Sequence, residues 1–401
     1  MSEQKRLTGG PLSGTKVLDF STLLPGPYAT MMLADMGAEV IRIESPKRGD
    51  LLREMAPRFD DRSYAHLAIN RNKKSLAIDL KTSESKSVIE TLIKAADIIV
   101  EQFRPGVMQR LGLDYESIKL INPKIIYCSI TGYGQSGPYK QRAGHDINYL
   151  ALSGLASYSG RQETGPVLSG TQVADIAGGS HHAVMGILAA VIARSTSGEG
   201  QWLDISMSDA ALALNTLYAP GALAEDKDPE LGKEVLNGGI FYDYYKTSDG
   251  RYFSVGALEP KFAVNFFTAI GKLHWTARAA NLNGDQTKLK QDIAKVFASK
   301  TFVEWQDKFG QKDICVEPVL TVNEAAKSCL FVQRAMICET QISEQQHVRQ
   351  IASPIKFKNQ LTRNFAGRKL GEDTVSVLSD AGYSSEAISR LLKARVVKQG
   401  E

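Results

Sequence analysis

The sequence predicts an α/β protein in which a parallel sheet carries helices on both faces, with a smaller α+β region further along the chain. Three observations support this. Buried strand-like runs alternate with helical runs in the first half of the chain, short aromatic runs replace them in residues 238–320, and helical periodicity returns near the C-terminus. Strands that alternate with helices form parallel sheets covered on both sides.

The first βαβ unit is the clearest local pattern. A buried strand is expected over residues 15–21, followed by a Pro-Gly-Pro turn at 25–27, a helix over 28–36 that ends at Gly37, and a second strand over 39–44. Glycine commonly follows the last residue of a helix. These segments therefore start the predicted sheet.

The later elements follow from the same reasoning. In the first half we expect helices at 85–96, 115–120 and 176–194 and beginning near Asp209, with strands at 97–103, 124–131 and 201–206. The smaller region has expected strands at 241–246 and 252–255 and helices at 262–269 and 288–298. The tail has expected helices at 323–336 and 384–394.

Bulk properties exclude several classes of protein. Lys and Arg number 48 against 44 Asp and Glu, so charge alone indicates no nucleic-acid or membrane partner. The four cysteines lack C-x-x-C spacing and are expected to be reduced thiols. The apolar stretches look too short or too broken to span a bilayer, no signal peptide is evident, and the chain does not end in S-K-L. We expect a cytoplasmic protein.

Common cofactor motifs are missing. The turn at residues 21–29 contains only Gly26, so the G-x-G-x-x-G of nicotinamide enzymes is absent, and no P-loop occurs. The six histidines do not form a zinc motif. We therefore expect neither a metal nor an added cofactor.

Cationic side chains instead cluster beside predicted strand ends, where open α/β sheets bind ligands. They are Arg42, Arg71, Lys73, Lys74, Arg104 and Arg110. Guanidinium groups suit phosphate, which makes a polyphosphorylated ligand plausible. The alternative is a solvated charged face, which is the commoner explanation of a charge run.

Two acid/base candidates stand out in the middle of the chain. Residues 144–154 read G-H-D-I-N-Y-L-A-L-S-G, and residues 173–179 read V-A-D-I-A-G-G. Taken alone, Asp175 is most simply a helix N-cap and His145 a structural histidine. Their context changes that interpretation.

The whole chain, over about residues 10–395, resembles the family III CoA-transferase superfamily. The resemblance rests on an ordered series of motifs: L-S-G at 12–14, G-A-E-V-I-R-I-E at 37–44, residues 70–76, F-R-P-G at 103–106, G-Y-G at 132–134, D-I-A-G-G at 175–179 and W-L-D-I-S-M at 202–207. It implies a substrate that is an acyl-CoA thioester. It also implies a Rossmann-like large domain built from both chain ends and a smaller α+β domain, in two interlocked subunits of a homodimer. The corresponding domain boundaries are 1–225, 238–320 and 325–401.

Within the superfamily, two reactions compete. Transferases use the Asp matched by Asp175 as a nucleophile and have a Gly-rich loop, where this chain has only Gly238 and Gly239. The α-methylacyl-CoA racemase branch resembles this chain more closely. It pairs that Asp with a His in G-H-D-I-N-Y-L-A-L-S-G, and it has a G-A-L-E-P segment matched by residues 256–260, in which Glu259 supports the His.

The resemblance therefore implies racemisation at the carbon next to the thioester. His145 and Asp175 would transfer protons on opposite faces of an enolate, Glu259 would orient the imidazole, and backbone N–H groups near Asp175 would stabilise the enolate oxygen. The implied CoA-binding residues are Arg42, Ile78, Gln102 (Asn in many relatives), Phe103, Arg104, Arg110 and Asp146. A CoA-transferase and a catalytically silent CoA-binding subunit remain the alternatives.

Overall fold

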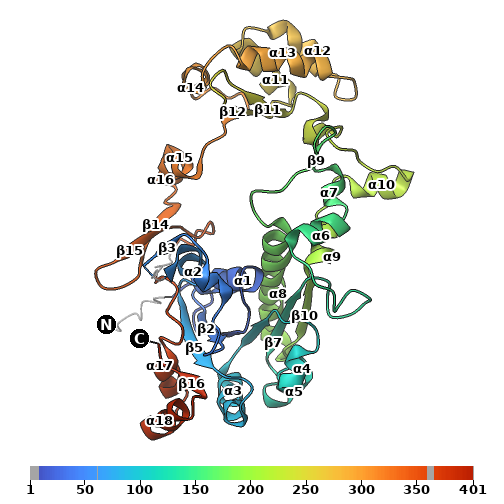
Figure 1. The fold of residues 1–401 in the computed structure, drawn as a ribbon. Helices are drawn as coiled ribbons and strands as arrows, with labels where there is room; N and C mark the ends of the chain where they lie inside the picture. The colour runs from blue at the N-terminus through green and yellow to red at the C-terminus, as the bar shows by residue number, and fades with distance from the viewer. Residues whose placement is uncertain (1–8, 61, 359–364, 401) are drawn as a thin grey trace, which may run out of the picture. The chain divides into compact units, whose positions relative to one another are not determined.

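The computed structural model describes residues 9–60, 62–358 and 365–400. The chain divides into two units (Figure 1). Unit 1 comprises Met1–Leu150, Thr171–Ala213 and Leu330–Glu401, and unit 2 comprises Ala151–Gly170 and Leu214–Cys329. The start of the predicted large domain, residues 1–8, lies outside the described residues.

Unit 1 is built on a seven-stranded sheet with the strand order β10-β7-β6-β1-β2-β5-β16. Every neighbouring pair is parallel except β5 and β16, which are antiparallel. The strands are β1 Lys16–Asp19, β2 Glu39–Glu44, β5 Lys73–Ile78, β6 Ile98–Glu101, β7 Ile126–Thr131, β10 Trp202–Ser206 and β16 Val397–Lys398. The predicted α/β class is therefore correct for unit 1.

Helices cover both faces of this sheet. On one face, α1 (Pro25–Asp35) contacts β1 and β2, and α8 (His182–Ser197) contacts β7 and β10. The core of the other face includes side chains of α3 Ser83–Ala95, α5 Tyr115–Ile121, α17 Thr374–Asp380 and α18 Ser385–Lys393. The shorter elements of unit 1 are η1 Leu51–Glu54, β3 Arg58–Phe59, β4 Arg62–Ser63, α2 Tyr64–Ile69, α4 Val107–Leu111, α6 Asp146–Leu152 (which begins in unit 1), η2 Ala174–His181, α9 Met207–Ala213, α16 Cys329–Gln333, β14 Ile337–Gln341 and β15 His347–Ile351.

Some predicted elements need correction. The Pro-Gly-Pro segment is not a turn before a helix, because α1 begins at Pro25. Proline is well suited to the first turn of a helix, where its missing N–H has no intrahelical partner in any case. The single helix expected at 323–336 is two helices, α15 (Val322–Lys327) and α16, separated by the extended backbone of Ser328.

One described helical run, Ala174–Ser197, is long and apolar enough to cross a membrane, with a mean hydropathy of 1.6. The expectation that the apolar stretches are too short or too broken to span a bilayer therefore does not hold for this run, by length and composition. This run comprises η2 and α8, and it packs on α1, β7 and β10. Those contacts are typical of a core helix in a folded domain.

Unit 2 contains a three-stranded antiparallel sheet in the order β11-β12-β13, formed by Asp243–Lys246, Tyr252–Val255 and Val316–Pro318. Leu289, Ile293 and Phe297 recur every four residues along α13 (Thr287–Phe297), so they lie on one face and enter the core. The other helices are α7 Leu155–Tyr158, α10 Ala219–Glu225, η3 Val235–Gly239, α11 Pro260–Ala269, η4 Leu273–Trp275, α12 Thr276–Ala279, α14 Phe302–Phe309 and α15. Strands β8 (Gly160–Arg161) and β9 (Gly165–Pro166) form a small hairpin.

The unit boundaries differ from the domain boundaries derived from the resemblance. Residues 151–170 and 214–225 were expected in the large domain but belong to unit 2. The reason is a set of contacts between segments distant in sequence. The Tyr158 hydroxyl donates to Asn215 Oδ1 at 2.7 Å, and Arg161 forms an ion pair with Asp243 of β11.

Candidate active site

His145 lies immediately before α6, in a backbone turn that its neighbours hold in place. Its N–H donates to Asn148 Oδ1 at 3.0 Å, and its carbonyl accepts from the Asn148 N–H at 2.8 Å. The Tyr149 hydroxyl donates to the Gly144 carbonyl at 2.7 Å. The His145 side chain is exposed. A fixed backbone with a free imidazole suits a residue that exchanges protons with a ligand.

Asp175 is the second residue of η2, a stretch of π-helix, a conformation that is frequent at functional sites. The Ser180 hydroxyl donates to the Pro25 carbonyl at 2.7 Å, which ties η2 to the start of α1. A Cβ at Gly179 would lie 3.1 Å from side-chain atoms of both Met207 and Pro25. The glycine thus allows the close packing that positions Asp175.

The carboxyl groups of Asp146 and Asp175 lie near each other. Asp146 Oδ1 accepts a hydrogen bond from the Asp175 N–H at 3.0 Å. Burial and the neighbouring Asp146 carboxylate raise the pKa of Asp175 to about 6, while His145 acts in the opposite direction. Asp175 is therefore partly protonated near neutral pH, as a group that both donates and accepts protons requires.

His145 and Asp175 line one cavity of about 420 Å³, all of it within unit 1. The same cavity is lined by Gln102, Phe103 and Arg104. Gln102 Oε1 accepts a hydrogen bond from the Gly26 N–H at 2.9 Å, so its carbonyl holds the first turn of α1. The structure thus brings the two predicted proton-transfer groups together with three of the predicted CoA-binding residues.

A second cavity of about 670 Å³ lies next to the first. Ile78, Phe103 and Arg110 line it, and Phe103 and Leu23 border both cavities. The adjoining volumes could take an extended ligand, with its reacting end near Asp175 and its far end near Ile78. Asp146, expected near the pantetheine, lies beside Asp175, where its carboxylate accepts the backbone N–H; its position near the pantetheine stays a prediction.

The expectation for Arg42 is not supported. Its neighbours Ile41 and Ile43 enter one core of the sheet, and because side chains alternate along a strand, Arg42 lies on the opposite face. There it is 1% exposed, paired with Asp50 and with Glu44 at 3.6 Å. This burial leaves no guanidinium surface for a phosphate.

Three other cations of the predicted cluster also have partners within the protein, and one of them, the half-buried Lys74, pairs with Glu39 at 2.6 Å and with Asp380 at 3.1 Å. Lys73 pairs with Asp19 at 3.2 Å, and Arg71 pairs with Asp35. Both cations are buried. Arg104 and Arg110 are exposed and remain the candidates for ligand phosphates.

Two further expectations concern residues around this cavity. Backbone N–H groups near Asp175 were expected to face an enolate oxygen, but the N–H of Asp175 donates to Asp146 and that of Ile176 to the Gln172 carbonyl. Glu259 is an exposed residue at the N-cap of α11 in unit 2, and the geometry of unit 1 does not include it. Its role beside His145 stays a prediction.

The arrangement described so far agrees with a match to a known family over most of the chain. A model of CoA-transferase family III matches residues 12–374. The chain belongs to this family. Among curated relatives of this family III protein, alpha-methylacyl-CoA racemase of Mus musculus is 36% identical over 389 residues, which are 96% of this chain and 97% of the relative.

Other relatives are named as CoA-transferases. Succinyl-CoA:glutarate CoA-transferase of Mus musculus is 30% identical and covers 98% of this family III chain and 91% of its own length. Among solved structures, a CAIB/BAIF family protein from Brucella suis has a TM-score of 0.81 at 28% identity, covering 93% of this chain and all of that one.

Sequence reasoning missed several residues of the family III site. Lys140 and Arg142 line the cavity of His145, and their position just before that residue was an available signal. Glu101 lines a separate cavity that Arg104 also borders. It ends β6, its Oε2 accepts the Phe103 N–H at 2.8 Å, and burial raises the pKa of Glu101 to about 7. An acidic residue at the end of an otherwise apolar strand was the signal there. Within the described residues, no group of His, Cys, Asp and Glu could hold a metal ion.

Proposed function

We propose that this family III protein racemises 2-methylacyl-CoA thioesters by proton transfer at the α-carbon. The observation that carries the proposal is the presence of His145 and Asp175 in one cavity, together with the pKa of about 6 for Asp175. The 36% identity to a curated racemase over nearly the full length supports it.

Before each turnover of the proposed reaction, one of the two residues His145 and Asp175 must be protonated and the other deprotonated. In one direction neutral His145 removes the α-proton while protonated Asp175 delivers its proton to the other face of the planar enolate. In the reverse direction the carboxylate of Asp175 removes a proton and the imidazolium of His145 returns one. Arg104 and Arg110, both exposed, would bind phosphates of the CoA moiety away from the reacting carbon.

The decisive experiment follows α-deuterium in heavy water with each epimer of a 2-methylacyl-CoA. Wild-type protein should exchange the α-proton and convert either epimer toward an equal mixture. His145→Ala and Asp175→Ala should each lose racemisation by roughly 10²–10⁴-fold, the usual effect of removing an acid/base group. Each variant should still exchange the α-proton of one epimer with solvent. Asp175→Ala should exchange it in the epimer whose proton faces His145, and His145→Ala should exchange it in the other epimer. Racemisation at the wild-type rate by both variants would refute the mechanism.

The second candidate is a CoA-transferase, which the transferase names of several relatives favour. In that reaction the Asp175 carboxylate would attack the thioester and form an anhydride, releasing CoA as the thiolate. The thiolate would then attack the Asp175 carbonyl of the anhydride, which forms an enzyme thioester and releases the donor acid as a carboxylate. Incubation with an acyl-CoA and a free acid distinguishes the two. The transferase would be established if the wild type exchanges CoA, Asp175→Ala does not, and His145→Ala still does.

We also propose that turnover needs no metal or added organic cofactor, because acid/base groups are sufficient for the proton transfers. Activity should survive exhaustive dialysis against a chelator. Recovery of activity only after a metal is added back would contradict this part of the proposal.

A further inference from the structure

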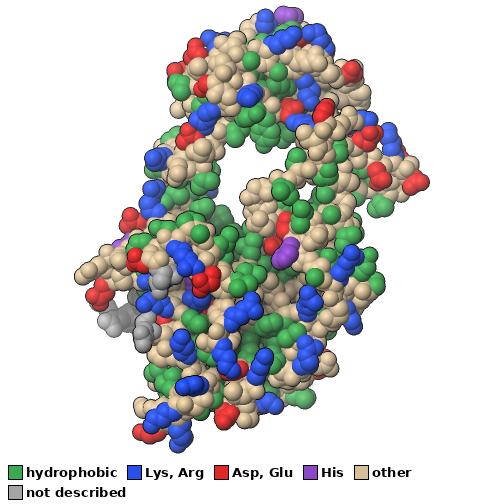
Figure 2. All heavy atoms as spheres, in the orientation of Figure 1, with side chains coloured by type: hydrophobic (Ala, Val, Ile, Leu, Met, Phe, Trp, Pro, Cys, Tyr) green, Lys and Arg blue, Asp and Glu red, His purple; other side chains and the backbone are tan. Residues whose placement is uncertain are grey.

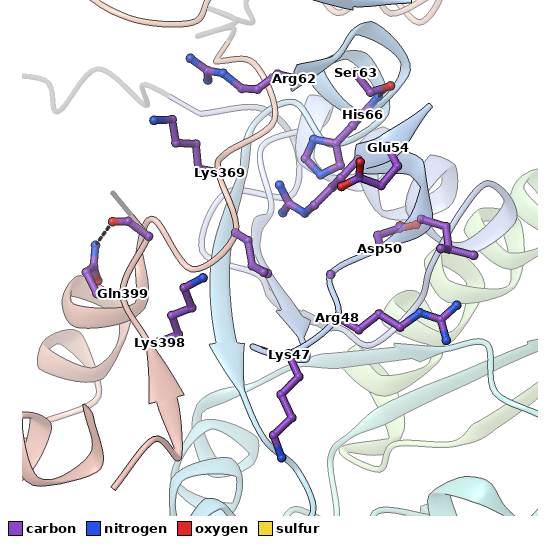
Figure 3. A pocket seen from close by; sticks show the side chains of 15 residues that line it. Lys47, Arg48, Asp50, Glu54, Arg62, Ser63, His66, Lys369, Lys398 and Gln399 are labelled. Atoms are coloured by element: carbon purple, nitrogen blue, oxygen red, sulfur yellow. Dashed lines mark hydrogen bonds between the residues drawn. The ribbon is translucent and has the colours of Figure 1, made fainter. Parts of the chain in front are cut away.

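A basic pocket of about 750 Å³ lies in unit 1, next to the cavity that borders Ile78 and Phe103. Its cationic residues come from two segments far apart in the sequence, the region after β2 and the C-terminal segment (Figure 3). They are Lys47, Arg48, Arg53, Arg62, Lys369 and Lys398. The acidic residues in the lining are Asp50 and Glu54. Lysine and arginine side chains also gather over the face of unit 1 seen in Figure 2.

Most of this positive charge is not neutralised by the protein itself. Arg48, Arg62, Lys369 and Lys398 form no ion pair with any of the described residues. Arg53, by contrast, pairs with the buried Glu44, and Lys47 pairs with Asp79 at 2.8 Å. The pocket carries six cations against two acids, whereas the whole chain has a net charge of only +4.

The wall of the pocket contains a second, independent sign of a ligand. His66 is 2% exposed, and its Nε2 has no hydrogen-bond partner among the described residues. Its ring lies at the wall of the pocket, near Glu54 (Figure 3). An unpaired buried polar atom costs free energy that a ligand oxygen could recover. Burial and the nearby Arg53 and Arg42 hold the pKa of His66 well below its ordinary value, so the ring is neutral when the pocket is empty.

We infer that this pocket binds a phosphate group, at a site distinct from the cavity of His145 and Asp175. Phosphate presents several acceptor oxygens, and both guanidinium and ammonium groups bind it through charge-assisted hydrogen bonds. The phosphate has two possible sources. Residues 48–51 border both this pocket and the neighbouring cavity, so the 3′-phosphate of a bound CoA could enter it, and so could a free phosphate compound.

Inorganic pyrophosphate tests the site by titration calorimetry, using a variant whose altered residues do not line the two neighbouring cavities. Lys369→Gln with Lys398→Gln removes two charges from the pocket alone. The matched control is Lys86→Gln with Lys94→Gln, which removes two exposed charges from α3. Pyrophosphate should bind wild type and control alike, and the pocket variant on the order of tenfold more weakly. Arg62→Gln serves as an independent pocket variant.

The inference fails if pyrophosphate shows no saturable binding to the wild type, or if pocket and control variants bind it equally. Comparing the binding of CoA with that of 3′-dephospho-CoA distinguishes the two possible sources of the phosphate. If CoA supplies it, pyrophosphate competes with CoA, and the pocket variant loses the preference for CoA over 3′-dephospho-CoA. If a free compound supplies it, pyrophosphate binds to CoA-saturated protein and that preference is unchanged. Because binding is measured without turnover, the result does not depend on whether the protein racemises its substrate.

Discussion

Asp146 and Asp175 show how one hydrogen bond can set the chemistry of a residue. The Asp146 carboxylate both accepts the Asp175 N–H and raises the pKa of Asp175. Asp146→Asn keeps an oxygen acceptor for that N–H but removes the charge. We expect the acidic limb of the kcat/KM profile to move to lower pH, by up to about one unit.

The pH profile of racemisation in both directions checks this expectation. Both directions should shift together, because their kcat/KM ratio equals an equilibrium constant that does not depend on pH. Asp226→Asn is a suitable control, since Asp226 has positive φ, which Asn tolerates, and it lies in unit 2. An unchanged acidic limb in Asp146→Asn would show that Asp146 does not control the ionisation of the pair.

The raised pKa of Asp175 also predicts a cost in stability. A carboxyl group whose pKa rises from 3.8 to about 6 on folding has no effect below the lower value. It destabilises the fold progressively as pH rises through that window, by up to about 3 kcal/mol once it is ionised. Asp175→Asn should therefore be more stable than wild type at pH 8 and closer to it at pH 5. Urea unfolding at the two pH values measures the difference, and an equal difference at both would contradict the linkage.

The limits of sequence reasoning are clearest for single residues. His145 and Asp175 could be identified because each sits in a contiguous motif whose local backbone fixes its position. Arg42 could not be assessed in the same way. Its burial depends on the alternation of β2 and on Asp50 and Asn70, which surround it from other segments. The sequence does not distinguish a strand cation that faces solvent from one that faces an internal carboxylate.

At the scale of elements, the strands and helices predicted from a strong local periodicity agree with the structure. The strand expected at 39–44 is β2 without change, and the helix expected at 85–96 corresponds to α3. Strand β5 was missed because Lys73 and Lys74 interrupt its apolar pattern, although pairing with β2 buries Lys73. Strand β16 is two residues long and exists through its pairing with β5, a long-range contact that its own sequence does not signal.

The junction between α1 and β6 gives a prediction at this scale. A Cβ at Gly26 would lie 2.2 Å from Ser21 Cβ, and Gly26 also donates to Gln102. Gly26→Ala should destabilise the protein by about 1–3 kcal/mol, the usual cost of overpacking. Gly221→Ala in α10 is the control: nothing lies within 4 Å of its added Cβ, and it should be neutral or stabilising. Thermal unfolding of both variants tests the contact, and equal melting temperatures would argue against it.

At the scale of the whole molecule, the two units show what a linear sequence conceals. The change of character at residue 238 was visible as a shift to aromatic strand-like runs. The earlier segment 151–170 looked continuous with the large domain, yet Tyr158 and Arg161 attach it to unit 2. Such long-range partners form only after the chain has folded, so composition could not place this boundary.

Association with a second copy is the last prediction, and a stripe on α8 is its physical basis. Met185, Ala189 and Ile192 recur at helical spacing and are exposed, Met185 by 56% and Ile192 by 70%. An apolar stripe on a helix is favourable only when something covers it. Together with the interlocked dimer that the family resemblance implies, it predicts that α8 lies in a dimer interface.

Sedimentation velocity should show a dimer for the wild type and for Leu120→Glu, which alters an isolated apolar residue that is 87% exposed on α5. Met185→Glu combined with Ile192→Glu should weaken the dimer, because two carboxylates would have to be desolvated at the interface. A wild-type monomer would refute the dimer, and a double variant that stays fully dimeric would place the interface elsewhere.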